Sequence, residues 1–254
     1  MPMENAVSLS INNQIGTLQI NNTALSNALS RAMMTDIADT LEQLNRDDSV
    51  RVIVIQSQGQ KTFCAGASLK ELSTLSSDEE ATHFFSGFAH ILIRMQQMKK
   101  LIIGRIQGKV VGGGLGIVAG CDYVIAHQNA AVKLSELSIG IGPFVIAPAV
   151  TRKIGATAFE ELSLAATQWR NANWSMQKGL YAEIAQDFDA LDEKVQERAN
   201  EFAAYPIEAV KTLRAWHWKN TANWQIELFE NAAITGKLAR QETTQSKLKS
   251  YFKK

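Results

Sequence analysis

The chain has 254 residues, of which 46 % are hydrophobic and 20 % are charged, and its formal net charge is +1. This composition is typical of a globular protein with a substantial core, and it lacks the strong basic bias of a general nucleic-acid binder. The two cysteines, Cys64 and Cys121, are too few for a disulfide framework, and neither they nor the four histidines have metal-site spacing. We therefore expect no metal site and interpret both cysteines as small buried hydrophobic residues.

The sequence contains no pattern typical of a membrane span or a secretory leader. The first ten residues, MPMENAVSLS, have no basic region followed by an apolar stretch, and no apolar run reaches about 18 residues. We expect a cytoplasmic protein with neither a membrane nor a nucleic-acid partner.

The first part of the chain alternates strands and helices, which predicts an α/β core. Hydrophobic periodicity and β-branched runs are the signals for these elements. In chain order, the pattern predicts a hairpin at 7–20, a helix at 27–47, a buried strand at 50–57, a helix at 83–98, a strand at 101–107, and short strands at 123–127 and 131–135.

Beyond about Pro148 the pattern predicts helices only. Two short helices are broken at Gly155, and an apolar stripe marks a helix at 191–205. Pro206 suits the first turn of the next helix, and the last fifty residues are all helical in pattern. We divide the chain into an α/β core, residues 1–195, and a C-terminal helical region, residues 196–254.

Two small-residue loops are candidates for presenting backbone amides to a ligand. FCAGASLKEL, residues 63–72, has uncovered amides and a nearby cation, although a plain turn into a helix capped by Ser68 is the alternative. VVGGGLGIVAGCD, residues 110–122, carries three consecutive glycines that need a reason. The amide of the middle one, at a helix N-terminus, would suit a developing negative charge.

The same glycine stretch has a second interpretation. Gly114, Gly116 and Ala119 fit the dinucleotide-binding pattern G-x-G-x-x-A, with Glu136 about 20 residues further on. The match starts in mid-chain, after one strand–helix–strand unit has passed. A nicotinamide-dependent dehydrogenase therefore stays open as an alternative.

One acid stands among apolar and small residues in LSELSIGIGPFVIAPAV, residues 134–150. Burial would raise the pKa of Glu136 and suit it to proton transfer, and a surface glutamate at a strand end is the other interpretation. Gly113 follows Ala67 by about 46 residues, and Glu136 follows Gly113 by about 23. Two amides from separate loops and one acid predict an oxyanion hole beside a proton-transfer group.

At these three blocks, in this order, the sequence resembles the enoyl-CoA hydratase/isomerase (crotonase) superfamily. The resemblance covers nearly the whole chain. It implies a crotonase-like spiral of ββα units with a C-terminal helical trimerisation region, and a homotrimer or homohexamer. It also implies an acyl-CoA substrate, of which coenzyme A is a part, so no separate cofactor is expected.

Carried over position by position, the resemblance implies a set of site residues. The amides of Ala67 and Gly113 would hold the thioester oxygen, and Glu136 would be the catalytic acid or base. The residues implied to bind the coenzyme A part are Ala65, Ser68, Leu69, Lys70 and Gly112.

The main departure from the family pattern is Gly116, which stands where two-glutamate hydratases have their first catalytic glutamate. The missing glutamate and the proline-containing loop resemble methylglutaconyl-CoA and carboxygeranoyl-CoA hydratases. The resemblance thus implies hydration of a branched or carboxylated 2-enoyl-CoA. A Δ3-Δ2 enoyl-CoA isomerase with one glutamate base and a non-catalytic acyl-CoA binder are the alternatives.

Further expectations concern the surroundings of the site. The acyl pocket is expected to use parts of residues 73–98 together with Phe144 and Val145, while His90 is expected to pack in the core. Ser68 replaces the aspartate that the family commonly has. The six basic residues from Lys237 onward are interpreted as a solvated helix face, or alternatively as a contact to coenzyme A phosphates.

Overall fold

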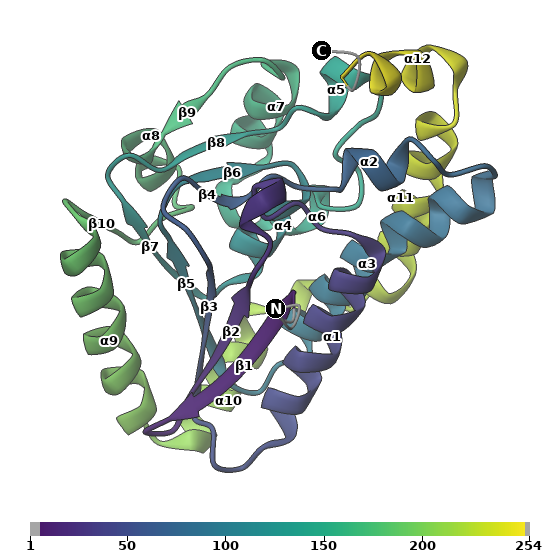
Figure 1. The fold of residues 1–254 in the computed structure, drawn as a ribbon. Helices are drawn as coiled ribbons and strands as arrows, with labels where there is room; N and C mark the ends of the chain where they lie inside the picture. The colour runs from purple at the N-terminus through teal and green to yellow at the C-terminus, as the bar shows by residue number, and fades with distance from the viewer. Residues whose placement is uncertain (1–5, 252–254) are drawn as a thin grey trace, which may run out of the picture.

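The computed structural model describes residues 6–251, which form two β-sheets surrounded by helices (Figure 1). The larger sheet has the strand order β1-β2-β3-β5-β7-β10, and the smaller has the order β4-β6-β8-β9. Among the strands of the described residues, only the pairs β1/β2 and β8/β9 are antiparallel. The strands are β1 (Val7–Asn12), β2 (Ile15–Ile20), β3 (Val52–Ser57), β4 (Thr62–Cys64), β5 (Leu101–Ile106), β6 (Lys109–Val111), β7 (Tyr123–His127), β8 (Ala131–Lys133), β9 (Arg170–Asn171) and β10 (Glu183–Ala185).

Three consecutive ββα units build the spiral that the resemblance implies. Strands β3, β5 and β7 are parallel neighbours in the larger sheet, and β4, β6 and β8 are parallel neighbours in the smaller one. The helices that follow these units are α2 (Leu69–Leu72), α3 (Asp78–Gln96), α4 (Gly113–Gly120) and α5 (Glu136–Ile139). Because the carboxyl ends of parallel neighbours meet at one edge, the loops after β4, β6 and β8 come together.

Helix α1 (Arg31–Arg46) starts four residues later than the periodicity predicts. The side chain of Ser30 accepts a hydrogen bond from the amide of Met33 and so caps the helix. Asn27 is instead in the left-handed region, at φ 56°, and its amide group donates to the carbonyls of Gln58 and Thr62. These long-range bonds hold Asn27 outside the helix.

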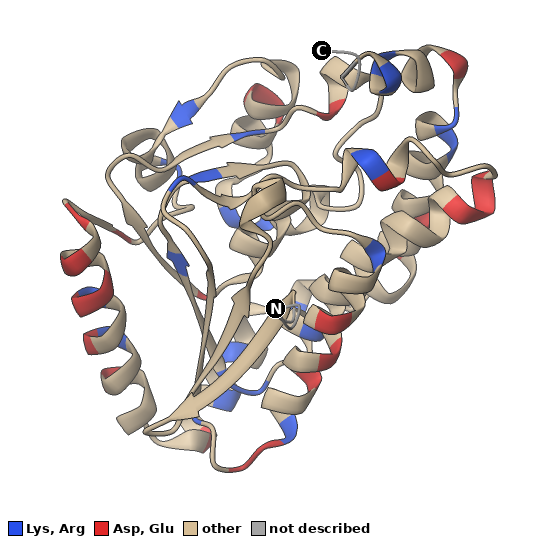
Figure 2. Cartoon of the chain, viewed as in Figure 1, with Lys and Arg blue, Asp and Glu red and all other residues tan. Residues whose placement is uncertain are grey.

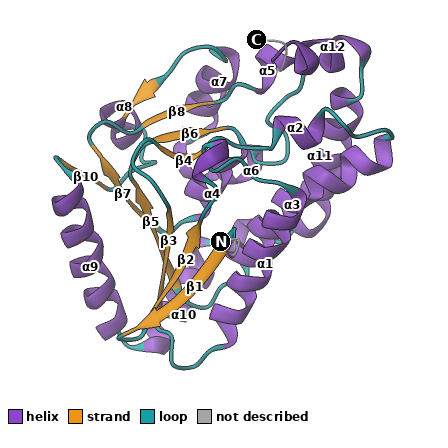
Figure 3. Cartoon of the chain, in the orientation of Figure 1, coloured by secondary structure: helices purple, strands orange, loops and turns teal. Residues whose placement is uncertain are grey.

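Helices cover both faces of the larger sheet (Figure 3). Helices α1 and α3 pack on one face, and α9 (Phe188–Ala204) packs on the other through the predicted stripe. The remaining helices are η1 (Thr23–Leu25), α6 (Ala147–Ile154), α7 (Ala156–Leu164), α8 (Ala172–Gln177), α10 (Ile207–His217), η2 (Lys219–Thr221), α11 (Trp224–Ala239) and α12 (Glu242–Tyr251). Between residues 6 and 251 no helix has both the length and the apolarity that a bilayer crossing requires.

The prediction of helices alone beyond Pro148 was wrong in two places. Strands β9 and β10 have two and three residues, which is too short to show a period. They form at the edges of the two sheets, where β9 pairs with β8 and β10 pairs with β7. The break at Gly155 between α6 and α7 is confirmed, and this residue has φ +81°.

The C-terminal helices pack onto the core of their own chain. Helix α11 lies along α3, where Gly236 approaches Thr82 so closely that a Cβ would stand 2.7 Å from the Thr82 amide nitrogen. In α10, the buried Arg214 forms an ion pair of 2.9 Å with Asp122. One hydrophobic cluster therefore extends from β1 to α12. The division at residue 195 falls within α9 and stays a prediction.

Candidate active site

The carboxyl ends of β4, β6 and β8 line a cavity of about 310 Å³. The parallel register of these three short strands brings the three sequence blocks to it. Six of the eight predicted site residues line this cavity: Ala65, Ala67, Leu69, Gly112, Gly113 and Glu136. The other two do not: Ser68 is buried and caps α2 by accepting a hydrogen bond from the amide of Glu71, and Lys70 is exposed.

The amide of Ala67 is directed by a single parallel bridge between Ala67 and Leu29. Leu29 donates its amide to the carbonyl of Gly66 at 2.8 Å, and Ser68 donates its amide to the carbonyl of Leu29 at 2.8 Å. Backbone groups alternate in direction along an extended segment, so the N–H of Ala67 points away from Leu29, and Ala67 lines the cavity.

The amide of Gly113 belongs to the first turn of α4, where helix N–H groups have no intrahelical partner. Gly112 precedes it with φ +53°, which favours glycine, and donates its own amide to the carbonyl of Lys133 at 3.0 Å. A Cβ on Gly66 would stand 3.4 Å from the Gly113 nitrogen. The loops after β4 and β6 are thus adjacent, and both line the cavity.

The carboxyl group of Glu136 lies beside Gly112, the residue before Gly113. A Cβ on Gly112 would stand 2.8 Å from Glu136 Oε1, so only glycine leaves room for the carboxyl group. Glu136 Oε2 is buried without a hydrogen-bond partner in the described part of the chain. Burial raises the pKa of Glu136 to about 7, against smaller opposing contributions from the backbone amides of Glu136 and Ser135. The interpretation as a surface glutamate was wrong.

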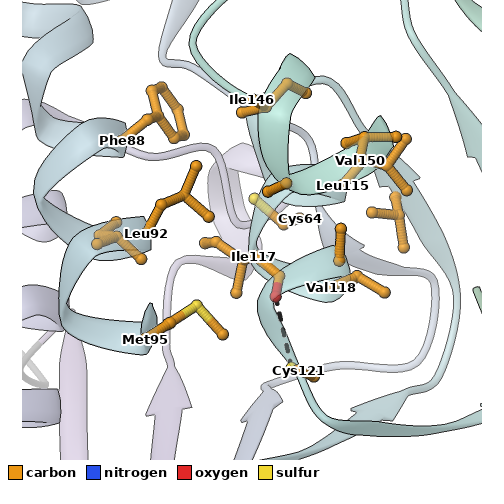
Figure 4. Packing of buried hydrophobic residues seen from close by; sticks show 14 of the residues in the cluster. Cys64, Phe88, Leu92, Met95, Leu115, Ile117, Val118, Cys121, Ile146 and Val150 are labelled. Carbon is orange, nitrogen blue, oxygen red and sulfur yellow. Dashed lines mark hydrogen bonds between the residues drawn. The ribbon is translucent and has the colours of Figure 1, made fainter. Parts of the chain in front are cut away.

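Position 116 has no room for an acid because Ile146 fills it. A Cβ on Gly116 would stand 2.5 Å from Ile146 Cγ2 and 2.9 Å from Ile146 Cβ. Figure 4 shows Ile146 and Val150 against one side of α4, with Phe88, Leu92 and Met95 of α3 opposite. Ile146 also lines the cavity. An apolar side chain therefore stands where a second carboxylate would reach.

Several residues around the cavity were missed by the sequence reasoning. Phe85 and Phe88 line it from α3, as predicted for residues 73–98, and Val145 does so too, whereas Phe144 is 37 % exposed and does not. His90 is exposed, which contradicts the core packing expected of it. The unexpected members are Lys133 and Ser135, which lie beside Glu136 along the chain, and Thr167 and Thr235, which no motif marks because distant elements supply them.

The two cysteines and the possible metal ligands among residues 6–251 form no second reactive site. Cys64 and Cys121 are buried free thiols, as predicted, and burial raises the pKa of each to about 12. Within residues 6–251, no group of three or more His, Cys, Asp or Glu side chains is placed to hold a metal ion.

The dinucleotide-binding interpretation was wrong for a topological reason. In that fold the strand before the glycine loop and the strand after its helix are parallel members of one sheet. Here β6 and β7, which flank α4, belong to different sheets. The glycines of this stretch instead leave room for neighbouring side chains, such as Phe88 at Gly113 and Ile146 at Gly116.

Comparison with known proteins agrees with this geometry. The family model described as enoyl-CoA hydratase/isomerase matches residues 10–254. A probable enoyl-CoA hydratase of Bacillus subtilis (strain 168) is 30 % identical over 210 residues, covering 82 % of this chain and 80 % of that protein. A crotonyl-CoA hydratase of Syntrophomonas wolfei is 29 % identical over 194 residues, covering 76 % of this chain and 74 % of that protein.

Solved structures share the fold. A crystal structure of an enoyl-CoA hydratase from Bacillus halodurans matches with a TM-score of 0.89 at 20 % identity, over 96 % of this chain and 99 % of that one. The α/β spiral with its C-terminal helical region is therefore the crotonase fold, as the resemblance implies. The chain belongs to the enoyl-CoA hydratase/isomerase family.

Proposed function

We propose that the chain is an enoyl-CoA hydratase that adds water to a 2-enoyl-CoA with Glu136 as its acid and base. One observation carries the proposal: Glu136, whose Oε2 is buried and unpartnered in the described part of the chain, lines the same cavity as Ala67 and Gly113. Relatives described as hydratases support the reaction class.

In this mechanism the amides of Ala67 and Gly113 donate to the thioester oxygen and stabilise the enolate. The Glu136 carboxylate removes a proton from a water molecule as its oxygen bonds to C3, and the electron pair of the double bond moves toward the thioester oxygen. The protonated Glu136 then returns the proton to C2 as the enolate collapses. Water is thereby added across C2 and C3, and the carboxylate is regenerated. A pKa of about 7 suits a group that takes and gives a proton at neutral pH.

The coenzyme A part of the substrate is proposed to run over the loop after β4. Ala65, Leu69 and Gly112 line the cavity there, Ser68 fixes the start of α2, and the exposed Lys70 is available to a phosphate group. Coenzyme A is part of the substrate, and no further cofactor is invoked.

The C-terminal basic segment is the other proposed contact for the coenzyme A phosphates. Lys247 of α12 donates to the carbonyl of Ser138 in α5, which brings this segment near the cavity. The expected Lys253 and Lys254 lie outside the described residues.

The finer expectations remain part of this proposal. They are a branched or carboxylated acyl group, assembly into a homotrimer or homohexamer, and a cytoplasmic location. Exposed large apolar side chains support self-association, since Leu164 is 74 % exposed and Trp216 62 %. Size-exclusion chromatography with light scattering tests the assembly.

A Δ3-Δ2 enoyl-CoA isomerase is the second candidate. It is favoured by Ile146, which leaves no second carboxylate beside the reacting carbons to hold a water molecule. One base that moves a proton from C2 to C4 through the same enolate would suffice for that reaction.

Labelled water separates these two reactions. The protein is incubated in ¹⁸O-water with crotonyl-CoA, and separately with a 3-enoyl-CoA, and the products are analysed by mass spectrometry. A hydratase gives a 3-hydroxyacyl-CoA that carries ¹⁸O, whereas an isomerase converts the 3-enoyl-CoA to the 2-enoyl-CoA without taking up oxygen. Glu136→Gln is expected to lose turnover at least ~100-fold while its affinity for acyl-CoA is retained.

Glu160→Gln is the matched control because Glu160 is exposed and lies outside the cavity lining. Full turnover in Glu136→Gln would refute the assignment of this residue. Tight acyl-CoA binding with no turnover on either substrate would instead favour a non-catalytic binder.

A further inference from the structure

The position of the Ala67 amide depends on a segment that lies outside the three sequence blocks. Residues 26–29, between η1 and α1, lie beside the loop after β4 as an additional parallel partner. The amide of Ala65 donates to the carbonyl of Ser26 at 3.1 Å, and the bridge between Leu29 and Ala67 follows. Among the described residues the Ala67 amide itself donates no hydrogen bond, so it is left for a ligand.

This segment has an unusual backbone conformation. Ser26 and Asn27 have φ angles of 54° and 56°, in the left-handed region that residues other than glycine seldom adopt. The only other non-glycine residues of the described chain with a positive φ are Asn13 and Gln14, which form the hairpin turn between β1 and β2. Ser26 and Asn27 form no hairpin turn. Backbone of this kind persists where the surrounding structure fixes it, and it is frequent at functional sites.

The side chain of Asn27 fixes this backbone. It is 1 % exposed, and both of its amide protons and its carbonyl oxygen are used in hydrogen bonds. The protons are donated to the carbonyls of Gln58 at 3.0 Å and Thr62 at 2.9 Å, and Oδ1 accepts the hydrogen bond from the amide of Asn22 at 2.9 Å. Because Thr62 is the first residue of β4, one side chain ties the segment to the strand that leads into the site loop.

The contact between the segment and the loop after β4 does not depend on charge. Residues 21–30 contain no Lys, Arg, Asp or Glu, and Figure 2 shows this stretch between β2 and α1 without a charged residue. Hydrogen bonds between neutral groups depend steeply on distance and angle. The segment therefore fixes where the loop lies, rather than attracting it over a distance.

The far end of the loop is anchored without Asn27. The amide of Ser68 donates to the carbonyl of Leu29 at 2.8 Å, and Oε2 of Glu71 in α2 accepts the hydrogen bond from the amide of Arg31 at 3.0 Å. These bonds remain when the side chain of Asn27 is removed. Its removal is therefore expected to shift the loop after β4 without releasing it.

We propose that Asn27 is a positioning residue for the amide of Ala67. This inference rests on the proposed function in one respect, that this amide donates to the thioester oxygen. Asn27 does not line the cavity and acts through residues 26–29 and the bridge at Leu29. Because negative charge develops on the thioester oxygen during the reaction, a displaced amide weakens the enolate more than the bound ester. Loss of Asn27 is thus expected to lower kcat much more than the affinity for a coenzyme A ester.

The test removes the side chain and keeps the backbone conformation. Asn27→Gly does this because glycine adopts a positive φ without steric cost. Asn13→Gly is the matched control, since it makes the same change at φ 49° in an exposed turn. The kcat and KM are measured with crotonyl-CoA. Isothermal titration calorimetry and infrared difference spectroscopy are carried out with butanoyl-CoA labelled with ¹³C at the thioester carbonyl, which has no double bond to hydrate.

The labelled carbonyl band reports directly on the hydrogen bonds to the thioester oxygen. In the wild type it is expected at a lower frequency in the complex than in the free ester, and Asn27→Gly should move it back toward the free value. The same variant should lower kcat about 10- to 100-fold, with a much smaller change in the dissociation constant of butanoyl-CoA. Asn13→Gly should change none of these quantities. Circular dichroism checks folding, and Asn27→Asp, which keeps the side-chain shape, replaces Asn27→Gly if that variant does not fold.

Two results in the variant would overturn the inference. The first is a folded Asn27→Gly with the wild-type band and kcat. The second is an equal loss of kcat and of butanoyl-CoA affinity with an unmoved band, which would give Asn27 a structural role only.

The wild type separates this inference from the proposed function. A band that does not move when butanoyl-CoA binds to the wild type would refute the role of the Ala67 amide, and the inference with it. A band that moves in the wild type and equally in Asn27→Gly would refute the inference alone. Because butanoyl-CoA does not react, the band decides between these outcomes even in the absence of turnover.

Discussion

The close approach of Ile146 to Gly116 yields a quantitative prediction about position 116. Alanine in place of glycine within a helix normally stabilises a protein by roughly 0.5–1 kcal/mol. In Gly116→Ala the new Cβ would stand 2.5 Å from Ile146 Cγ2, about 1 Å inside the usual contact distance of roughly 3.5–4.0 Å. Ile146 is 3 % exposed and branched at Cβ, so it cannot move without its backbone.

Overpacking of this kind costs about 1–3 kcal/mol, which exceeds the helix gain, so Gly116→Ala should lower the free energy of unfolding by about 1–2 kcal/mol. Ile146→Ala alone should cost about 2 kcal/mol, the low end for such truncations, because the side chain already borders a cavity. The double variant should lose less free energy of unfolding than the two single losses added together, by about 1–3 kcal/mol.

Urea unfolding followed by circular dichroism, at one protein concentration, measures these free energies. Gly120→Ala is the control in the same helix, because its Cβ would meet the Sδ of Met95 at 2.7 Å, at the flexible end of a side chain. Its cost should be smaller, and Ile146→Ala should not relieve it. A stabilised Gly116→Ala, or additive effects in the double variant, would show that Ile146 does not occupy this space.

Two further predictions concern charge. The Glu136 carboxyl group acts first as a base, so kcat/KM should fall about tenfold per pH unit below its pKa of about 7, and a flat profile from pH 5 to 8 would contradict this role. The folded-state pKa is raised from the ordinary 4.5, so the group favours the folded state fully below about pH 4.5 and this contribution is lost as the pH rises through about 7. Glu136→Gln should consequently be more stable than the wild type at pH 8, by an amount on the order of 3 kcal/mol, and the difference should close by pH 4 in thermal melts. Arg214→Met should lower the free energy of unfolding by about 3–5 kcal/mol, because it leaves the Asp122 carboxylate buried and unpaired. Arg46→Met, at an ion pair whose arginine side chain is 78 % exposed, should cost about 1 kcal/mol or less in the same urea titration, and equal losses in the two variants would refute the argument.

The sequence by itself determined most of the local elements and the order of the three blocks. The stripe of α9, the break at Gly155 and the hairpin of β1 and β2 each follow from a period or a turn within a few residues. The consecutive glycines and the small residues after β4 likewise predict, from the sequence alone, backbone that a ligand can approach. These signals are local, so they can be read along the chain.

Only the tertiary structure decided what these blocks do together. The parallel register of β4, β6 and β8 brings Ala67, Gly113 and Glu136 to one cavity, and burial there raises the pKa of Glu136. The same packing places Ile146 over Gly116 and brings Lys133 to the cavity lining. Pairs such as these lie tens of residues apart or carry no motif, and a period or a motif reports only on neighbours along the chain. Burial and distance are properties of the folded chain, and they determine the charge state and the reach of each side chain.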